Sequence, residues 1–288
     1  MKLLSILTPA ETMLLTDSSF GLKQLMKYTF MDLLLKKVIE IKVEKRRVLE
    51  EDENGTRIEV IRSYDYVICG KNFGKYTPKK HEVFFLPLFN NPKSFKILFL
   101  HFVIMAYENI DSLTSFKKAV LKSENLKGLL KANIFQKLFG WFSLTKAGKE
   151  AARDILIHLN PVDDDIQELI SNDQKKALSL LLGLGGNILL LRNLDFELMN
   201  KIDPQLWKEH KSTIISSYGS GDRDYDHDVD SDWQFYFDYY DDNSGVEANF
   251  DEFESIIDTL EIQAANSSSY ESDCDSGCSS CGGCGGCD

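Results

Sequence analysis

The sequence has no apolar run long enough to cross a membrane, and its first three quarters contain one cysteine, Cys69. The two most apolar stretches, residues 95–107 and 177–191, are shorter than the ~20 residues that a membrane-spanning helix needs. The apolar start at residues 3–7 is followed by Thr-Pro-Ala-Glu, which ends the hydrophobic region that a secretory signal requires. We therefore expect a cytoplasmic protein without a transmembrane segment, in which Cys69 stays reduced.

Catalytic motifs are also missing. The sequence contains no G-x-S-x-G, H-E-x-x-H or Walker pattern, and its five histidines lie apart from motif-like partners. The glycines at positions 183, 185 and 186 lie between helical runs rather than directly after a strand, where a phosphate-binding loop would be found. These absences favour a protein that is not an enzyme.

Basic residues nearly disappear from the C-terminal quarter. Residues 222–288 contain one basic residue, Arg223, and 19 acidic residues, whereas residues 1–221 contain 32 basic and 26 acidic residues. Aspartate occupies every second position from Asp222 to Asp232, and an aromatic patch follows at residues 233–240. The chain is thus a mildly basic body with an acidic tail. We hypothesise that the acidic segment folds back on the body and competes there with an anionic partner.

Hydrophobic periodicity predicts a helical body that starts with two helices and a hairpin. Thr8 can cap a helix that begins at Pro9, and Glu11 completes a capping box. Apolar residues at helical spacing predict a second helix over residues 20–37. Alternating residues from position 39, and a turn that contains Asn54-Gly55, then predict a β-hairpin. Helix, helix and hairpin is the order of a winged-helix unit.

A looser copy of this order follows. Residues 95–107, 115–121 and 126–134 have helical character, residues 139–144 are a short strand candidate, and Thr145 precedes another helix as Thr8 does. Helices over residues 164–170, 173–182 and 187–200 would end the body. We expect a mainly α protein of two winged-helix-like units (residues 1–92 and 93–216) in which a helical cap completes the second. An acidic aromatic segment (217–265), with an amphipathic helix over 250–262, and a disordered Cys/Gly-rich tail (266–288) would follow.

The C-terminal cysteines are a candidate metal site. Cys278, Cys281, Cys284 and Cys287 repeat at C-x-x-C spacing, and four thiolates can hold a zinc ion in tetrahedral geometry. Part of this spacing also occurs in iron–sulfur proteins. The alternative is a disordered extension that binds soft metals without a defined site, because no apolar residues surround these thiols to support one.

Basic residues of the body are candidate anion-binding residues. Lys118 and Lys122 lie one turn apart on a predicted helix, and Lys137, Trp141 and Arg153 surround the second predicted hairpin. Lysines on one helix face can neutralise phosphate groups, and a solvated surface is the alternative for each group. Nucleic acid is a weaker choice of partner, because the first hairpin has an acidic tip at residues 50–53 and the chain is acidic overall.

Four stretches resemble the Golgi phosphoprotein 3 family. Residues 7–15, Leu-Thr-Pro-Ala-Glu-Thr-Met-Leu-Leu, are similar to its opening L-T-x-x-E-x-x-L-L, and residues 30–39, 126–142 and 172–182 are similar to later segments. The resemblance spans residues 5–195 and implies binding of a phosphoinositide-like headgroup without catalysis. It places headgroup contacts at Phe20, Lys27, Lys118 and Lys122, where lysine lacks the bidentate geometry of the family's arginines. The tail past residue 216 is similar only to Cys/Gly-rich ends of uncharacterised bacterial proteins.

These observations predict a non-enzymatic cytoplasmic protein that engages an anionic lipid headgroup or protein partner through a basic face, with peripheral membrane contact. Two alternatives remain open: a metal-binding protein that uses the C-terminal cysteines, with zinc as its cofactor, and a winged-helix DNA-binding protein.

Overall fold

The computed structural model describes residues 2–51, 55–89, 96–131, 142–194, 202 and 246–269, with side chains of the last segment at 251–263. The aspartate repeat, the aromatic patch, Lys137, Trp141 and the four candidate metal-binding cysteines lie outside these residues. Helices dominate the described part, which also holds a small antiparallel sheet. None of its helices is long and apolar enough to cross a membrane.

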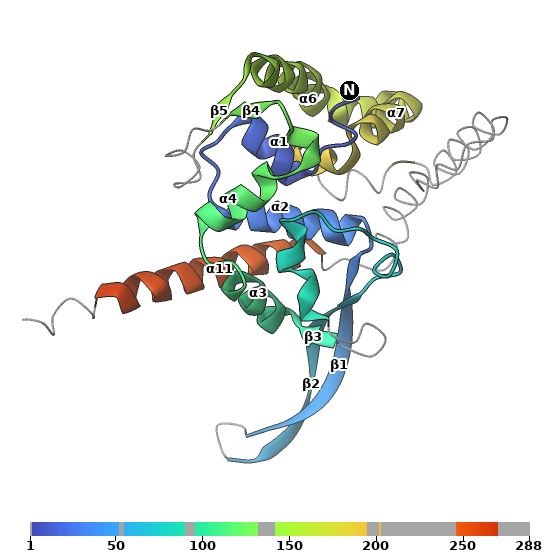
Figure 1. The fold of residues 1–288 in the computed structure, drawn as a ribbon. Coiled ribbons are helices and arrows are strands. Elements are labelled where there is room, and N and C mark those ends of the chain that lie inside the picture. Colours follow the sequence, from blue (N-terminus) through green and yellow to red (C-terminus); the bar gives the residue numbers. More distant parts are fainter. Residues whose placement is uncertain are drawn as a thin grey trace, which may run out of the picture.

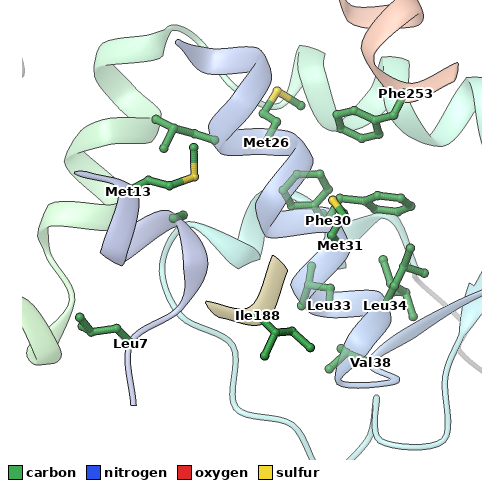
Figure 2. Close-up of a cluster of buried hydrophobic side chains, with 14 of the residues drawn as sticks. Leu7, Met13, Met26, Phe30, Met31, Leu33, Leu34, Val38, Ile188 and Phe253 are labelled. Atoms are coloured by element: carbon green, nitrogen blue, oxygen red, sulfur yellow. The ribbon is translucent and has the colours of Figure 1, made fainter. Parts of the chain in front are cut away.

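Helices α1 (Pro9–Thr16) and α2 (Leu22–Leu35) form the centre of the molecule. The predicted capping box is confirmed: the Thr8 hydroxyl accepts a hydrogen bond from the Glu11 amide, and the Glu11 carboxylate accepts one from the Thr8 amide (2.8 Å). In the last turn of α2, Met31, Leu33 and Leu34 belong to the hydrophobic core, and Asp32 belongs to the ionic cluster described below. Phe30 and Leu33 of α2 are fully buried, and Figure 2 shows them among the core side chains of neighbouring elements.

The predicted hairpin is confirmed as β1 (Ile39–Glu51) and β2 (Arg57–Cys69), which pair antiparallel along their whole length. A third strand, β3 (Lys96–Leu98), adds to β2. Only the base of the sheet enters the core, where Ile39 and Val67 are fully buried, whereas Leu49 and Ile61 are 70% and 64% exposed. The hairpin therefore projects away from the helices (Figure 1).

After β2 the chain forms two short 3₁₀ turns, η1 (Glu82–Phe84) and η2 (Leu86–Leu88), and then helices α3 (Phe99–Glu108) and α4 (Leu113–Leu121). These two helices confirm most of the helical character predicted for residues 95–107 and 115–121. The helix predicted over residues 126–134 does not continue α4. Leu126 ends a 3₁₀ turn, η3 (Glu124–Leu126), and the short strand β4 (Leu130–Lys131) follows and pairs with β5 (Ser143–Leu144). Gly128, at φ +81°, ends the helical conformation before this strand.

Helix α6 (Lys146–Asn172) is longer than predicted and continues through Pro161. Thr145 caps its start, as expected, by accepting a hydrogen bond from the Gly148 amide (3.0 Å). Pro161 cannot bond to the carbonyl of Ile157, but both residues face solvent, so water can satisfy that carbonyl. Helix α7 (Gln174–Leu184) confirms the predicted helix over 173–182. The helix predicted from residue 187 begins instead as a 3₁₀ turn, η4 (Gly185–Leu190).

The amphipathic helix predicted over residues 250–262 is confirmed and extends further, as α11 (Val246–Ser269). It lies across α2 and α3 (Figure 1), and Phe253, Ile256 and Ile257 are buried there. One hydrophobic core therefore includes residues from Leu4 to Ile257. The assignment of two winged-helix units, and the boundaries near residues 92 and 216, stay predictions.

Candidate functional site

The predicted anion-binding residues that the structure describes come from several separate segments. Lys118 belongs to α4 and Lys122 is its C-terminal cap, whereas Arg153 is exposed on α6. Phe20 lies just before α2 and Lys27 within it. The other two predicted residues, Lys137 and Trp141, lie outside the described residues. The described part of the chain also holds no group of three or more His, Cys, Asp or Glu side chains placed to bind a metal ion.

Two lysines of α2 bind carboxylates from the far end of the chain. Lys23 Nζ lies 2.8 Å from Asp258 of α11, and Lys27 Nζ lies 2.5 Å from Glu254, one turn earlier on that helix. The hydrogen bond with Asp258 raises the pKa of Lys23. We call Lys23 and Lys27 the α2 basic face. Of the predicted anion-binding residues, Lys27 thus holds an anionic group, and this group belongs to the same chain.

A cleft with a volume of about 480 Å³ opens beside α1. Helices α1, α2 and α6, the segment between α1 and α2, and the residues at the end of η4 contribute to its walls. The lining side chains are Thr12, Met13, Thr16, Phe20, Tyr28, Leu159, Asn160, Asp163, Leu190 and Arg192. Of the residues predicted to contact an anionic headgroup, only Phe20 lines this cleft.

The position of Arg192 at the cleft is fixed by Asp163 of α6. One oxygen of the Asp163 carboxylate accepts a hydrogen bond from Arg192 Nε (2.9 Å), and the other accepts one from the Asn193 amide (2.9 Å). The Asn193 side chain in turn donates to the Asp163 carbonyl (2.9 Å). The carboxylate is 5% exposed, whereas the Arg192 side chain is 80% exposed. Asp163 therefore holds the guanidinium from its inner side and leaves its outer side accessible.

Buried polar contacts place η4, and with it Leu190 and Arg192, beside α1. The Asn187 side chain donates to the carbonyls of Leu4 (2.6 Å) and Leu7 (2.9 Å). Gly186 lies so close to Asp32 of α2 that an added Cβ would be 2.4 Å from its Oδ1 atom. In the sequence, the pair of glycines followed by Asn187 is the local signal for this close approach.

Lys36, at the end of α2, is the centre of a buried ionic cluster. Its Nζ atom lies 2.7 Å from Asp32 and 3.4 Å from Glu82, and the Tyr76 hydroxyl donates to Glu82 (2.8 Å). Burial raises the pKa of Asp32. Burial also opposes the charge on Lys36, but the carboxylates of Asp32 and Glu82 raise the pKa of Lys36 well above its usual value. The cluster therefore joins α2 to the segment that follows β2.

A second cluster surrounds Glu11 of α1. Lys79 Nζ lies 2.8 Å from the Glu11 carboxylate, and the Asn125 side chain donates to the same oxygen (3.3 Å). Burial works against the charge, but Lys79 holds the pKa of Glu11 below its usual value. His81 is fully buried beside this pair, with Nε2 3.4 Å from the Thr8 hydroxyl. Burial lowers the pKa of His81 to about 4, so it is neutral at physiological pH.

These clusters are suited to holding the fold together rather than to catalysis. The side chains of Asp32, Glu82 and Glu11 are at most 2% exposed, and none of the three lines the cleft. The pairs that close the two clusters, Lys36 with Glu82 and Lys79 with Glu11, join residues that are distant along the chain, so no local sequence pattern predicts them.

The chain was compared with protein-family models, with curated proteins and with solved structures. The resemblance to the Golgi phosphoprotein 3 family therefore rests on the quoted sequence stretches alone, because none of the three comparisons gives a match.

Proposed function

We propose that this protein is a non-enzymatic binding protein that engages an anionic partner through the α2 basic face. The observation that supports the proposal is that Lys23 and Lys27 already hold two carboxylates, those of Asp258 and Glu254. A face that accepts carboxylates at this spacing can accept the oxygens of a phosphorylated headgroup. The resemblance to the Golgi phosphoprotein 3 family favours a phosphoinositide-like headgroup, and with it contact with a membrane surface.

The two ion pairs are weak enough to be exchanged. The side chains of Lys23 and Asp258 are 31% and 51% exposed, and those of Lys27 and Glu254 are 18% and 35% exposed. Partly exposed pairs of this kind contribute at most about 1 kcal/mol each. In contrast, α11 is held by three buried apolar side chains. An anionic partner can therefore replace the carboxylates while the helix stays in place.

The test removes the competing charges without removing α11. The double variant Glu254→Gln and Asp258→Asn leaves Lys23 and Lys27 without their partners, so we expect tighter binding to phosphatidylcholine vesicles that contain phosphatidylinositol 4-phosphate. Co-sedimentation at low and high salt measures this, because charge-based binding weakens with salt. The matched control is Asp251→Asn with Glu252→Gln, which makes the same charge change at two exposed residues of α11.

Two further variants decide where the anion binds. Lys23→Ala with Lys27→Ala should abolish binding if the α2 basic face is the site. Lys118→Glu with Lys122→Glu tests the α4 residues to which the family resemblance points. Binding that is insensitive to the α2 pair but lost with the α4 pair would reject the α2 face. Vesicle binding that neither pair changes would reject the whole proposal.

Zinc binding by the C-terminal cysteines is a second candidate function, supported by the C-x-x-C spacing of Cys278, Cys281, Cys284 and Cys287. Elemental analysis of the purified full-length chain, prepared under reducing conditions, should then give zinc in a fixed ratio to protein. A variant with all four cysteines replaced by serine should lose this metal. Equal metal content in both proteins would eliminate the candidate.

A further inference from the structure

We infer that the cleft between α1 and α6 is a second binding site, distinct from the α2 basic face, for a small anion carried on an apolar body. Its volume of about 480 Å³ falls within the ~300–1,000 Å³ typical of small-molecule sites. Three properties of its lining support the inference: a buried hydroxyl without a partner, a guanidinium held in position, and apolar walls.

The hydroxyl is that of Thr12, on α1. Thr12 is fully buried, and its Oγ1 atom has no hydrogen-bond partner among the described residues. Other helical threonines nearby satisfy their hydroxyls locally: Thr16 donates to the Thr12 carbonyl (2.9 Å), and Thr29 donates to the Leu25 carbonyl (2.7 Å). A buried hydroxyl that makes no bond is costly to the fold. Thr12 lines the cleft, so an oxygen atom of a ligand that pushes aside the side chains covering its hydroxyl can supply the missing partner.

The guanidinium of Arg192 supplies the charge. Its Nε atom is bonded to Asp163, which leaves the two terminal nitrogens on its exposed side to donate to a carboxylate or phosphate, the arrangement for which arginine is suited. Both oxygens of the Asp163 carboxylate already accept hydrogen bonds, from Arg192 Nε and from the Asn193 amide. They therefore do not compete with a ligand for the two terminal nitrogens of Arg192. Arg192 and Asp163 are the only charged side chains that line the cleft in the described part of the chain. The site therefore fits a ligand with one anionic group.

The remaining walls define the rest of the ligand. Most of the remaining lining is apolar: Met13, Phe20, Leu159 and Leu190, with the aromatic ring of Tyr28. The polar residues among the rest are Thr16, whose hydroxyl already donates to the Thr12 carbonyl, and Asn160. These surfaces favour an alkyl chain or a ring over a second polar group. The lining thus selects an amphipathic anion, such as a medium-chain carboxylate or an alkyl phosphate monoester.

Isothermal titration of the full-length protein with octanoate, octyl phosphate and octanol tests the inference. We expect octanoate or octyl phosphate to bind more tightly than octanol, because only the two anions can pair with Arg192. Whichever of them binds more tightly identifies the anionic group as carboxylate or phosphate. Binding of none of the three, or equal binding of octanol and the anions, would overturn the inference.

Variants then locate the site. Arg192→Ala should weaken binding of the preferred anion by about tenfold or more, as expected for the loss of a charge-assisted hydrogen bond. Arg57→Ala is the matched control, because it removes the same side chain, 74% exposed, from β2 outside the cleft. Thr12→Val keeps the shape of the side chain and should also weaken binding. Equal affinities for Arg192→Ala and Arg57→Ala would overturn the inference, and far-ultraviolet circular dichroism confirms that each variant is folded.

This test is independent of the α2 basic face. Lys23 and Lys27 do not line the cleft, so Lys23→Ala with Lys27→Ala should leave octanoate or octyl phosphate binding unchanged. A loss of binding in that double variant would assign the anion to α2 and reject the cleft as its site.

Discussion

The ring of Phe253 stacks on that of Phe30, with centroids 5.2 Å apart and an angle of 18° between the planes. Figure 2 shows Phe253 reaching from α11 toward Phe30 on α2. Both side chains are fully buried. A segment within the acidic tail thus completes the core formed by the N-terminal helices. A truncation before α11 would therefore expose Phe30 and is unsuitable for separating body from tail.

We expect Phe253→Ala to lower the free energy of unfolding by about 3–5 kcal/mol, because it removes a fully buried aromatic ring from the core. Urea denaturation followed by circular dichroism measures the change. Ile262→Ala is the control: Ile262 lies on the same helix but is 61% exposed, so its loss should change stability by less than about 0.5 kcal/mol. Equal stability of the two variants would mean that α11 does not unfold together with the body.

Lys36→Met should destabilise the protein by about 3 kcal/mol near neutral pH, because it leaves the buried carboxylates of Asp32 and Glu82 without their cation. Unpaired buried carboxylates have raised pKa values. The deficit should therefore shrink as the pH falls and these groups take up protons. Chemical denaturation at neutral and mildly acidic pH measures both effects. Lys149→Met, at an exposed position of α6, should have little effect, and a pH-independent deficit would contradict the ionic explanation.

His81 should make the protein less stable as the pH falls from about 6.5 toward 4. Burial lowers its folded-state pKa from 6.5 to about 4, so in this window the unfolded chain takes up a proton that the folded protein does not. Linkage gives a loss of up to about 1.4 kcal/mol for each pH unit. The substitution His81→Gln removes the imidazole and keeps the neighbouring charged residues Glu11, Glu82, Lys79 and Lys36.

The measurement compares the stability of wild type and His81→Gln at pH 7 and pH 5.5. The wild type should lose more stability than the variant over this interval, which lies above the range where the carboxylates with lowered pKa titrate. His101→Gln is the control, because His101 is exposed on α3. Parallel pH profiles for wild type and His81→Gln would show that His81 does not carry the effect.

Gly148→Ala should destabilise the protein, although alanine favours helices by about 1 kcal/mol over glycine. An added Cβ at Gly148, in the first turn of α6, would lie 2.0 Å from the Leu129 carbonyl oxygen. That carbonyl is backbone next to β4, so the contact cannot be relieved by turning a side chain, and we expect a net cost of about 1–3 kcal/mol. Gly74→Ala is the control, because an added Cβ there meets nothing within 4 Å. A stabilised Gly148→Ala variant would contradict this packing.

Local sequence signals predicted the features that depend on neighbouring residues. The caps at Thr8 and Thr145, the hairpin between Ile39 and Cys69, and the amphipathic character of α11 all follow from spacing within a few residues. One predicted boundary was wrong. A separate helix was predicted over residues 164–170, but α6 is continuous from Lys146 to Asn172. Pro161 lies on an exposed face of this helix, where the lost hydrogen bond is tolerated.

The candidate sites were harder to predict. The sequence indicated Lys27 and Phe20 through a family resemblance, and the structure places Lys27 at the α2 basic face and Phe20 at the cleft. Arg192, Asp163 and Thr12 carried no recognisable signal, because a single arginine, aspartate or threonine in a helical region has many ordinary roles. Their importance comes from the cleft that α1, α2, α6 and η4 form together.

The sequence by itself determined the mainly helical class, the start of α1 and α6, the β-hairpin and the split between a basic body and an acidic tail. These depend on periodicity, capping and charge, which act over short distances along the chain. Tertiary structure alone decided that Glu11 meets Lys79, that Lys36 meets Glu82, and that α11 returns to cover Phe30. Such contacts join distant segments, and their free energy depends on burial that only the assembled core provides.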